Sequence, residues 1–512
     1  MSQRLTRPEK LTLGILGFTC FLFHVIVNVN GAYGFFRDEL YYLACSDHLA
    51  LGYVDQPPFS IYLLKLSRLI FGDSLTAIRL IPSLAHAGTV VLAGLISREM
   101  GGKVYAIFLS AFVVMLTPIL IGMSSFYSMN SIDILIWSLA IWVILKIVNT
   151  REEKYWRWLG IVLGIGLLNK ISVLFLGAGI FVGFMVIDRK WFTTRWPYFA
   201  GILAFILFAP YVVWNLTHDL AHLEFIHNAS AGKYSGRSPL DFVSEQFLYL
   251  NPVAAPLWIG GLIVLFVYKP LREYRLIGLI YLTAFIILLL NRTSKGEYLA
   301  PAYACLFAAA SVFIEQKFVN ASLNWIRYVY PALILVSVII LLPMILPVLP
   351  VEKYIKYAKS IGFEPSSSEN KELAELPQFY ADMFGWKEKA ADVARVYNSL
   401  PEDEKATCTI ISTNYGRCGA IDFFGEQYGL PKSIGLHNNY WLWGPGDYTG
   451  KEVLIILGGK LADHKDDFES VELAGVSECQ YCMPYENHVN IFICRGLKFP
   501  VQDSWAAEKN YE

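Results

Sequence analysis

Three carboxylates that could act as general bases lie close together near the start of the chain. Asp38 and Glu39 stand in an aromatic-rich run, and Asp55 is followed by Gln56 and two prolines. One carboxylate of such a group can take a proton from an incoming hydroxyl or amine, while the others hold the substrate or a metal ion. The prolines would fix the loop backbone. The alternative is a solvated loop whose Asp and Glu cap a helix, with Asp38 in a position that suits an N-cap.

Other polar residues could complete a site. His218 and His222 are four positions apart, which on a helix places both imidazoles on one face, where they could bind a divalent metal ion. The alternative is a polar helix that lies in the lipid headgroups. Asp133, with Asn130 before it, either faces a cavity or belongs to the acidic site. His437 and Trp441 have the composition of a carbohydrate-contacting surface, although packing of Trp441 is the favoured interpretation.

The elements that must position these residues are mostly apolar. Of 512 residues, 55% are hydrophobic and 17% are charged, whereas globular proteins have about 45–50% and roughly 25%. Residues 1–350 hold 26 basic and 18 acidic side chains, and residues 351–512 hold 16 and 25. A net +8 portion is therefore joined to a net −9 portion. Neither part has the basic stripe that nucleic-acid binding needs, so no nucleic-acid partner is expected.

Apolar runs that approach the roughly 20 residues of a membrane-crossing helix fill the first 350 residues. They predict eleven spans, namely 11–29, 77–97, 104–122, 132–148, 158–169, 171–187, 198–214, 252–268, 276–291, 298–314 and 328–347. The stretch 158–187 could also be one long helix. Two spans place the later basic clusters on the side of the N-terminus, as the positive-inside rule requires, so we favour two.

This topology predicts a multi-pass protein of the plasma (inner) membrane with a membrane domain at 1–350. A second domain, 351–512, is expected on the outer face with an α/β fold, because 390–400 has a helical pattern and 408–412, 453–457 and 489–494 read as buried strands. Five of the eight cysteines fall in this second domain. Disulfides are plausible there, but their connectivity cannot be read from the sequence.

The order and placement of several short motifs resemble those of polyprenyl-phosphate-sugar-dependent membrane glycosyltransferases. This group includes the bacterial family 39 enzymes, which are related to protein O-mannosyltransferases and to the aminoarabinose transferase of lipid A. The motifs that carry the resemblance are Asp38-Glu39, Asp55-Gln56-Pro57-Pro58, Arg79-Leu80, the segment 129–133, the segment 214–219, the segment 295–301 and the segment 437–445.

The resemblance implies the C-type glycosyltransferase fold and an inverting transfer from a polyprenyl-phosphate sugar to a lipid, glycan or protein acceptor. Asp38 matches the acidic residue proposed as the base, Glu39 is its neighbour, and Asp55 matches the acidic position before the prolines. Some relatives have Glu-Lys where this chain has Asp55-Gln56. One cation near the donor phosphate is therefore missing here.

A leaving phosphate gains negative charge as the glycosidic bond breaks, so it needs cationic or hydrogen-bonding partners. Lys295, Tyr298, Lys170 and Arg292 are the candidates. For three of them the alternative is ordinary anchoring at the membrane interface. Lys170 is a candidate because an ionisable residue at membrane depth marks a functional site by default.

Two other functions stay open. A multispan transporter or flippase of lipid-linked glycans would use buried charges for transport, but no inverted repeat is evident and few ionisable residues interrupt the spans. A non-catalytic scaffold would not need the carboxylates. No cofactor is required by any motif, and a divalent metal ion remains an open alternative.

Overall fold

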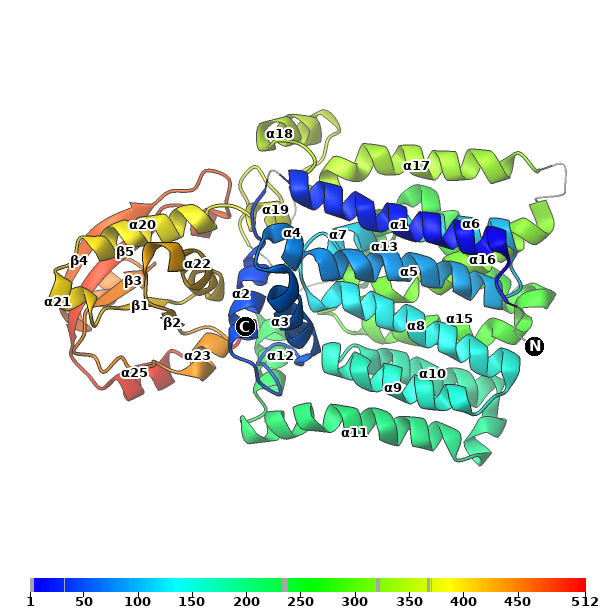
Figure 1. The fold of residues 1–512 in the computed structure, drawn as a ribbon, viewed down its shortest axis with the longest axis horizontal. Helices are drawn as coiled ribbons and strands as arrows, with labels where there is room; N and C mark the ends of the chain where they lie inside the picture. Colours follow the sequence, from blue (N-terminus) through cyan, green and yellow to red (C-terminus); the bar gives the residue numbers. More distant parts are fainter. Residues whose placement is uncertain (1–3, 32, 233–237, 319–322, 366–368, 370) are drawn as a thin grey trace. The chain divides into compact units, whose positions relative to one another are not determined.

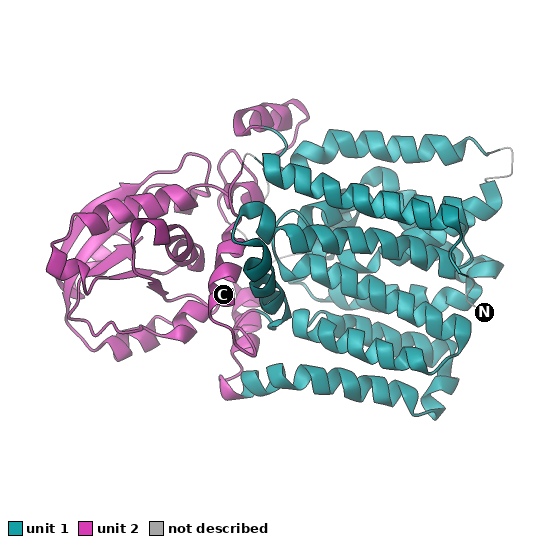
Figure 2. Cartoon of the chain, in the orientation of Figure 1, with its two compact units in different colours: residues 1–31, 56–216, 235–349 teal, residues 32–55, 217–234, 350–512 magenta. Residues whose placement is uncertain are grey.

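The structure is a computed structural model that describes residues 4–31, 33–232, 238–318, 323–365, 369 and 371–512. The chain forms two compact units (Figure 2). Unit 1 comprises residues 1–31, 56–216 and 235–349, and unit 2 comprises residues 32–55, 217–234 and 350–512. Two segments from the first half of the sequence thus belong to unit 2, whereas the division into domains at residue 350 stays a prediction.

Unit 1 is a helical bundle (Figure 1). Its elements are α1 (Arg7–Asn30), α3 (Phe59–Phe71), α4 (Leu75–Ile78), α5 (Leu80–Glu99), α6 (Val104–Met115), α7 (Pro118–Met123), α8 (Met129–Thr150), α9 (Lys154–Asn169), α10 (Val173–Ile187), η1 (Arg189–Thr193), α11 (Trp196–Thr217), α13 (Pro239–Tyr249), η2 (Pro252–Ala254), α14 (Ala255–Val267), η3 (Lys269–Tyr274), α15 (Arg275–Leu290), η4 (Gly296–Ala302), α16 (Ala304–Phe318) and α17 (Ile326–Ile345).

Several helices of unit 1 have the length and composition of membrane spans. Within the described residues, six are long and apolar enough to cross a bilayer, and eight are if each of two bent helix pairs forms one span. Two shorter apolar helices, α6 and α10, accompany them. The protein is therefore a multi-pass membrane protein. All eleven predicted segments fall on helical structure, but the number of crossings stays a prediction.

The stretch 158–187 forms two helices. α9 ends at Asn169, Lys170 is extended, and α10 begins at Val173. The interpretation as two short helices is confirmed. Lys170 consequently lies at a helix end and not in the middle of a long apolar helix.

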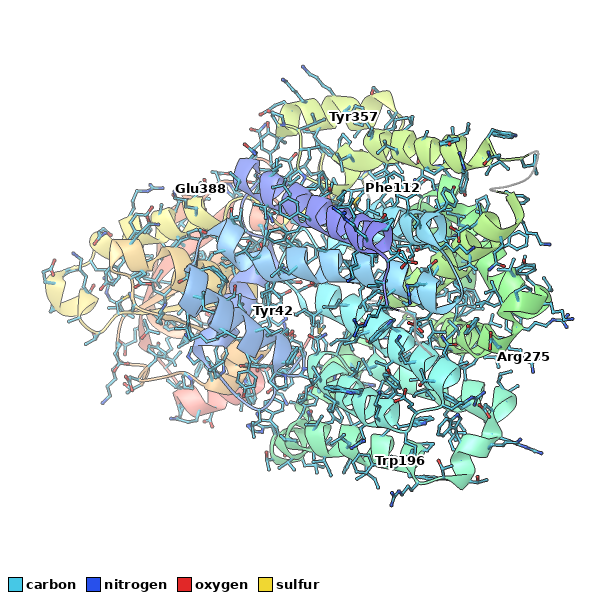
Figure 3. The ribbon with its side chains drawn as sticks, turned by 45° about the vertical axis from the view of Figure 1, so that its right-hand side comes forward. Tyr42, Phe112, Trp196, Arg275, Tyr357 and Glu388 are labelled. Carbon is cyan, nitrogen blue, oxygen red and sulfur yellow. The ribbon has the colours of Figure 1, made fainter. Side chains whose placement is uncertain are left out.

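One end of unit 1 carries a network of basic and acidic side chains. Arg98 at the end of α5 lies 3.3 Å from the Glu9 carboxylate of α1, and Lys146 of α8 pairs with Glu99. Tyr274 donates a hydrogen bond of 3.0 Å to the Glu99 carbonyl. The N-terminus of α1 lies at this end (Figure 1), as do the labelled residues that begin α11 and α15 (Figure 3). The basic clusters of the sequence therefore share one end of the bundle.

Unit 2 is an α/β structure. Its elements are α2 (Arg37–Asp47), α12 (Ala221–Ala231), α18 (Val351–Ser360), α19 (Gln378–Ala381), α20 (Trp386–Asn398), α21 (Glu402–Lys405), β1 (Thr409–Ser412), α22 (Tyr415–Phe424), η5 (Glu426–Tyr428), β2 (Ser433–Gly435), α23 (Asn439–Trp443), β3 (Leu454–Leu457), α24 (Leu461–His464), β4 (Phe468–Ser477), η6 (Pro484–Glu486), β5 (Val489–Leu497) and α25 (Val501–Ala507).

The five strands form one mixed sheet in the order β2-β1-β3-β5-β4. β1 is parallel to β2 and β3, whereas β5 is antiparallel to β3 and β4. Alternate residues of β3 enter opposite cores: Ile455 packs with Val393 of α20 and Ile421 of α22, and Leu454 packs with Val501 of α25. Helices thus cover both faces of the sheet (Figure 1).

The three predicted strands are confirmed as β1, β3 and β5, and the helix predicted at 390–400 overlaps α20, which ends at Asn398. β2 and β4 were not predicted. β2 has only three residues, and β4 has exposed acidic residues such as Glu469 and Glu472 in place of a hydrophobic run. All eight cysteines lie in the described ranges and are free thiols; of the two alternatives, disulfide or buried thiol, the structure shows the thiols.

A pair of adjacent glycines tests the helix packing of unit 1. A Cβ on Gly261 of α14 would overlap the backbone carbonyl oxygen of Leu306 in α16, whereas a Cβ on Gly260 meets no atom within 4 Å. We predict that Gly261→Ala lowers stability by about 1–3 kcal/mol, because α14 and α16 must separate. Gly260→Ala should be neutral or stabilising, since alanine favours a helix. Thermal unfolding in detergent compares the two, and equal midpoints would contradict this packing.

Candidate functional site

The two adjacent carboxylates of α2 have different environments. α2 begins at Arg37 with Phe36 as its N-cap residue, and Glu39 accepts a 2.9 Å hydrogen bond from the Phe36 backbone N–H. The expectation that Asp38 is the N-cap residue is therefore wrong, whereas the expectation that the Glu of this pair caps the helix is confirmed, because the carboxylate of a capping box is in the third helical position. Glu39 is fully buried in this role. Asp38 is left for other contacts.

Asp38 is the accessible member of the pair. Its Oδ1 accepts a 2.8 Å hydrogen bond from the Tyr415 hydroxyl and lies 3.5 Å from Nε of Arg37. Its side chain is nevertheless 36% exposed. A carboxylate with one oxygen held and part of its surface open can receive a proton from a bound molecule.

Arg37 connects α2 with segments far along the chain. Its guanidinium lies 3.6 Å from the Asp382 carboxylate and 3.4 Å from the Glu369 carboxylate, and it donates a 2.8 Å hydrogen bond to the Tyr485 hydroxyl. The Arg37 backbone N–H also donates to the Asp382 carbonyl at 2.9 Å. Burial raises the pKa of Asp382 to about 7, although the charge of Arg37 acts in the opposite direction.

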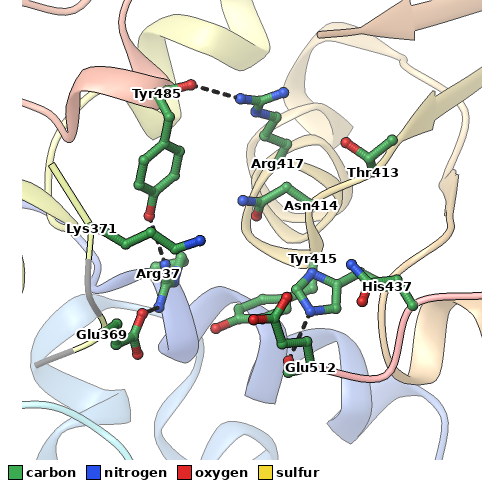
Figure 4. Close-up of a pocket in the computed structure, with 11 residues that line it drawn as sticks. Arg37, Glu369, Lys371, Thr413, Asn414, Tyr415, Arg417, His437, Tyr485 and Glu512 are labelled. Atoms are coloured by element: carbon green, nitrogen blue, oxygen red, sulfur yellow. Dashed lines mark hydrogen bonds and ion pairs between the residues drawn. The ribbon is translucent and has the colours of Figure 1, made fainter. Parts of the chain in front are cut away.

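A polar pocket with a volume of about 320 Å³ lies beside these residues (Figure 4). Both contacts of Asp38, Arg37 and Tyr415, belong to its wall. The full lining is Arg37, Glu369, Lys371, Thr413, Asn414, Tyr415, Arg417, His437, Tyr485, Asn510 and Glu512. Cationic, anionic and neutral hydrogen-bonding groups face one space, which suits a ligand with many hydroxyls or a charged headgroup.

Asp55 belongs to unit 2, as Asp38 does. Its Oδ1 accepts a 2.8 Å hydrogen bond from the hydroxyl of Tyr41, which in turn accepts one of 2.5 Å from Asn439 Nδ2. Burial, together with the Asp55 charge, raises the pKa of Tyr41, so this phenol stays a donor. The Tyr41 ring lies 4.8 Å from the Tyr415 ring. Asp38 and Asp55 are thus each held by one of two neighbouring tyrosines.

The two predicted contact residues of the tail have different positions. His437 lines the pocket, and its Nε2 lies 2.9 Å from the Glu512 backbone carbonyl. Trp441 is packed: its indole N–H donates a 2.7 Å hydrogen bond to the Trp505 carbonyl, and it is not part of the pocket wall. The packing interpretation of Trp441 agrees with this geometry.

His218 and His222 do not share a helix face. α12 begins only at Ala221, and the two residues before it, Asp219 and Leu220, have positive φ angles of 52° and 58°. His222 is buried with its Nδ1 3.0 Å from the Val54 carbonyl. The assumption that both histidines lie on one helix is therefore wrong. A divalent ion at His218 and His222 stays a prediction, but the helical spacing no longer supports it.

In unit 1, several predicted residues meet around Lys170. Its Nζ donates a 2.7 Å hydrogen bond to Asn130 Oδ1, lies 4.0 Å from Asp133 Oδ2, and is 5.3 Å from the Tyr298 ring centroid. Asp133 also accepts a 2.9 Å hydrogen bond from Ser172. Asn130 is near the N-terminus of α8, where the helix dipole favours an anion. This Lys170 cluster combines a cation with an anion-favouring helix end.

Lys295 and Arg292 differ from Lys170. Lys295 is buried, with its Nζ 3.9 Å from the Glu297 carboxylate, and it precedes η4, which carries Tyr298. Arg292 is exposed. Among the described residues, Tyr298 contacts Lys170, whereas Arg292 is not seen in this cluster.

Of the residues that line the pocket, sequence reasoning named only His437; four of those it missed are Arg37, Tyr415, Arg417 and Tyr485. Arg417 lies 2.9 Å from the buried Glu486 carboxylate, and both this arginine and Lys389 lower the pKa of that carboxyl group although its burial acts to raise it. Three of the four come from the tail, hundreds of positions from Asp38. Only Arg37 could have been predicted from the sequence as a neighbour of the site, because it directly precedes Asp38.

Parts of the chain are similar in sequence to known sugar transferases. Residues 55–214 match the family described as dolichyl-phosphate-mannose-protein mannosyltransferase. A lipid A galacturonosyltransferase of Rhizobium johnstonii is 27% identical over 258 residues, which cover 49% of this chain and 54% of that protein. An undecaprenyl phosphate-α-4-amino-4-deoxy-L-arabinose arabinosyl transferase of Pseudomonas fluorescens is 26% identical over 127 residues, which cover 24% and 22%. The chain thus matches about half, or less, of the length of these relatives.

The fold extends the match over nearly the whole chain. The crystal structure of ArnT from Cupriavidus metallidurans bound to undecaprenyl phosphate has a TM-score of 0.60 at 11% identity, with coverage of 94% of this chain and 97% of that one. The chain therefore shares the fold of this structure and is similar, over part of its length, to the sugar transferases described above. The expected resemblance and the fold are confirmed, whereas the roles of the individual residues are not tested by these comparisons.

The buried Asp382 predicts a pH-dependent stability. Its pKa of about 7 in the folded state lies far above the unfolded value of about 3.9. The folded state therefore binds more protons between these values, and stability falls as the pH rises from about 4 to 7. We expect a loss on the order of 2 kcal/mol between pH 5 and 7. Asp382→Asn should flatten the decline.

Thermal midpoints measured across this pH range test the assignment. Asp466→Asn is the matched control, because Asp466 is exposed and should leave the curve unchanged. A wild-type curve that coincides in shape with the Asp382→Asn curve would contradict the role of this carboxyl group.

Proposed function

We propose that this protein is an inverting glycosyltransferase that moves a sugar from a polyprenyl-phosphate donor to an envelope acceptor. The single observation that carries the proposal is the state of Asp38: one oxygen is held by Tyr415, the side chain is partly open, and two of its contacts line a polar pocket. The relatives that match the chain are named as sugar transferases, which favours this function over a transporter or flippase.

In the proposed reaction Asp38 is the general base. An acceptor hydroxyl gives its proton to the carboxylate, its oxygen forms a bond to the anomeric carbon, and the bond from that carbon to the phosphate oxygen breaks. The products are the inverted glycoside and a polyprenyl monophosphate. Tyr415 and Arg37 position the base in this scheme, and Glu39 supports the helix.

The acceptor is proposed to be the saccharide headgroup of an envelope lipid. The pocket offers Arg37, Lys371 and Arg417 together with Glu369 and several neutral hydrogen-bonding groups. Such a mixture suits hydroxyls and phosphates better than an apolar ligand. The lipid A specificity in the name of the Rhizobium relative points to the same class. Protein and glycan acceptors are the alternatives that an assay can separate.

We propose that the Lys170 cluster holds the donor phosphate. Lys170 supplies a cation, Tyr298 and Asn130 border it, and α8 presents its N-terminus. These groups would stabilise the charge that grows on the leaving phosphate. Lys295 is a second candidate, whereas Arg292 has less support because it is exposed.

For orientation, we propose eleven crossings with the basic end of unit 1 in the cytosol and the α/β domain on the opposite side of the inner membrane. The clustering of basic residues at one bundle end supports this, because positive loops stay on the cytosolic side. The resulting arrangement would give Asp38 access to extracytoplasmic acceptors.

Neighbouring carboxylates provide the first test of the mechanism. Asp38→Asn should lower kcat for sugar transfer by about 10²–10⁴, because the base is lost while its side-chain size is kept. Glu39→Gln is the matched control and should change kcat little, since glutamine can also serve in a capping box. Transfer from radiolabelled polyprenyl-phosphate sugars into membrane glycolipids is the measurement. Full activity of Asp38→Asn would remove Asp38 from the mechanism.

A second test uses two lysines that flank α9. Lys170→Gln should raise KM for the donor about 10- to 100-fold, because a charge-assisted hydrogen bond contributes about 1.5–3 kcal/mol. Lys154→Gln, at the other end of the same helix, changes an exposed lysine and should leave KM unchanged. Steady-state kinetics with varied donor measures both. An unaltered KM in Lys170→Gln would show that the phosphate binds elsewhere.

A further inference from the structure

A group of three potential metal ligands lies outside the proposed transfer site, between two helices of unit 1. Cys20 and His24 are one turn apart on α1, and His86 is on α5. Their ligand atoms all lie within 4.8 Å of one another. The three residues are 1%, 1% and 2% exposed. No step of the proposed reaction uses them.

The position of this group follows from the packing of α1. One stripe of α1, which includes Leu13, Gly17, Cys20 and His24, is buried, while residues such as Phe18 on the other side are exposed. The cysteine and histidine thus face the protein and not the lipid. Polar residues inside membrane spans are expensive and usually functional.

A glycine sets the close approach of α1 and α5. A Cβ on Gly17 would lie 2.9 Å from the Val91 side chain of α5, which is closer than real Cβ contacts. The backbones therefore lie near each other one turn before Cys20. This approach brings short side chains such as Cys20 within reach of His86.

The two imidazoles are held in a geometry that suits metal binding. His24 Nε2 lies 2.9 Å from His86 Nδ1, and His86 Nε2 lies 3.2 Å from the Val114 carbonyl oxygen. Because a carbonyl only accepts, His86 carries its proton on Nε2, and its Nδ1 has a free electron pair directed toward His24. A metal-binding histidine typically donates its other N–H to a carbonyl in this way.

We propose that Cys20, His24 and His86 form a binding site for one soft metal ion, and that the ion is Cu(I). Thiolate and imidazole ligands select copper and zinc among the common metals. One thiolate, two neutral imidazoles and Cu(I) give a complex without net charge, whereas Zn(II) would leave one positive charge buried in the span. Since burial of an unpaired charge is costly, the site favours the monovalent ion.

Binding requires a small, balanced rearrangement. The Cys20 thiol releases its proton to solvent, and the thiolate sulfur forms a bond to the metal. The proton on His24 Nε2 moves to Nδ1, which leaves Nε2 as a ligand. The two ring nitrogens separate from 2.9 Å to about 3.4–3.6 Å, as two metal–nitrogen bonds of about 2.0–2.1 Å require. One proton leaves for each ion bound.

The test uses the purified, reduced full-length chain in detergent. The protein is equilibrated with Cu(I) under anaerobic conditions, passed over a desalting column, and analysed for metal. We expect one copper per chain. Cys20→Ala and His86→Gln should each weaken Cu(I) binding at least tenfold in competition with a chromogenic chelator. Cys305→Ala is the matched control, because Cys305 is another buried thiol of unit 1 that donates to the Ala302 carbonyl.

Two further measurements keep the test decisive. X-ray absorption of the wild-type copper complex should show one sulfur and two nitrogen ligands, which does not depend on whether a variant folds. Size-exclusion profiles verify folding of the variants. A wild-type chain that retains no copper, or copper binding that is equal in all variants, would overturn the site. One tightly bound zinc, lost in the same variants while copper fails to bind, would overturn the assignment of the ion.

Discussion

The buried guanidinium of Arg37 is the charge around which the polar part of unit 2 is arranged. It joins α2 to Asp382, Glu369 and Tyr485, and its neighbour Asp38 is the carboxylate beside the pocket. A buried cation without partners is unstable, so the segments that carry these groups must come together for the unit to fold. The same ion pairs that satisfy Arg37 therefore fix the position of Asp38. Structure and proposed catalysis depend on one set of contacts.

Unit 1 shows a similar constraint in apolar surroundings. Lys170 and Asp133 lie in helical segments of low polarity, and each has a partner within reach: Asn130 for the lysine and Ser172 for the carboxylate. Lys170 is extended at the end of α9, which allows its side chain to meet the beginning of α8. Satisfaction of polar groups at helix ends thus leaves a cation beside a helix N-terminus. An anionic phosphate is the ligand that this combination favours.

The sequence was sufficient for the membrane helices and the α/β character of the second part, because apolar periodicity is a short-range signal. The catalytic role of Asp38 stays a prediction. The distribution of basic residues, through the positive-inside rule, also predicted that the stretch 158–187 forms two helices that are separated at Lys170. The sequence was insufficient for the pocket wall, since Tyr415, Arg417 and Tyr485 reach Arg37 only through tertiary folding. The short strand β2, the exposed strand β4 and the positive φ angles before α12 have no hydrophobic signature. The prediction that His218 and His222 share a helix face was wrong because two residues between them, Asp219 and Leu220, have positive φ angles and α12 begins only at Ala221.

We propose that the chain cleaves a polyprenyl-phosphate sugar and does not transport it intact. The most direct measurement follows donor labelled in both the sugar and the lipid in proteoliposomes that contain the purified protein and a glycolipid acceptor. The account predicts equal amounts of released polyprenyl monophosphate and of acceptor-linked sugar, with the anomeric configuration inverted. Movement of intact donor between the leaflets without formation of either product would contradict it.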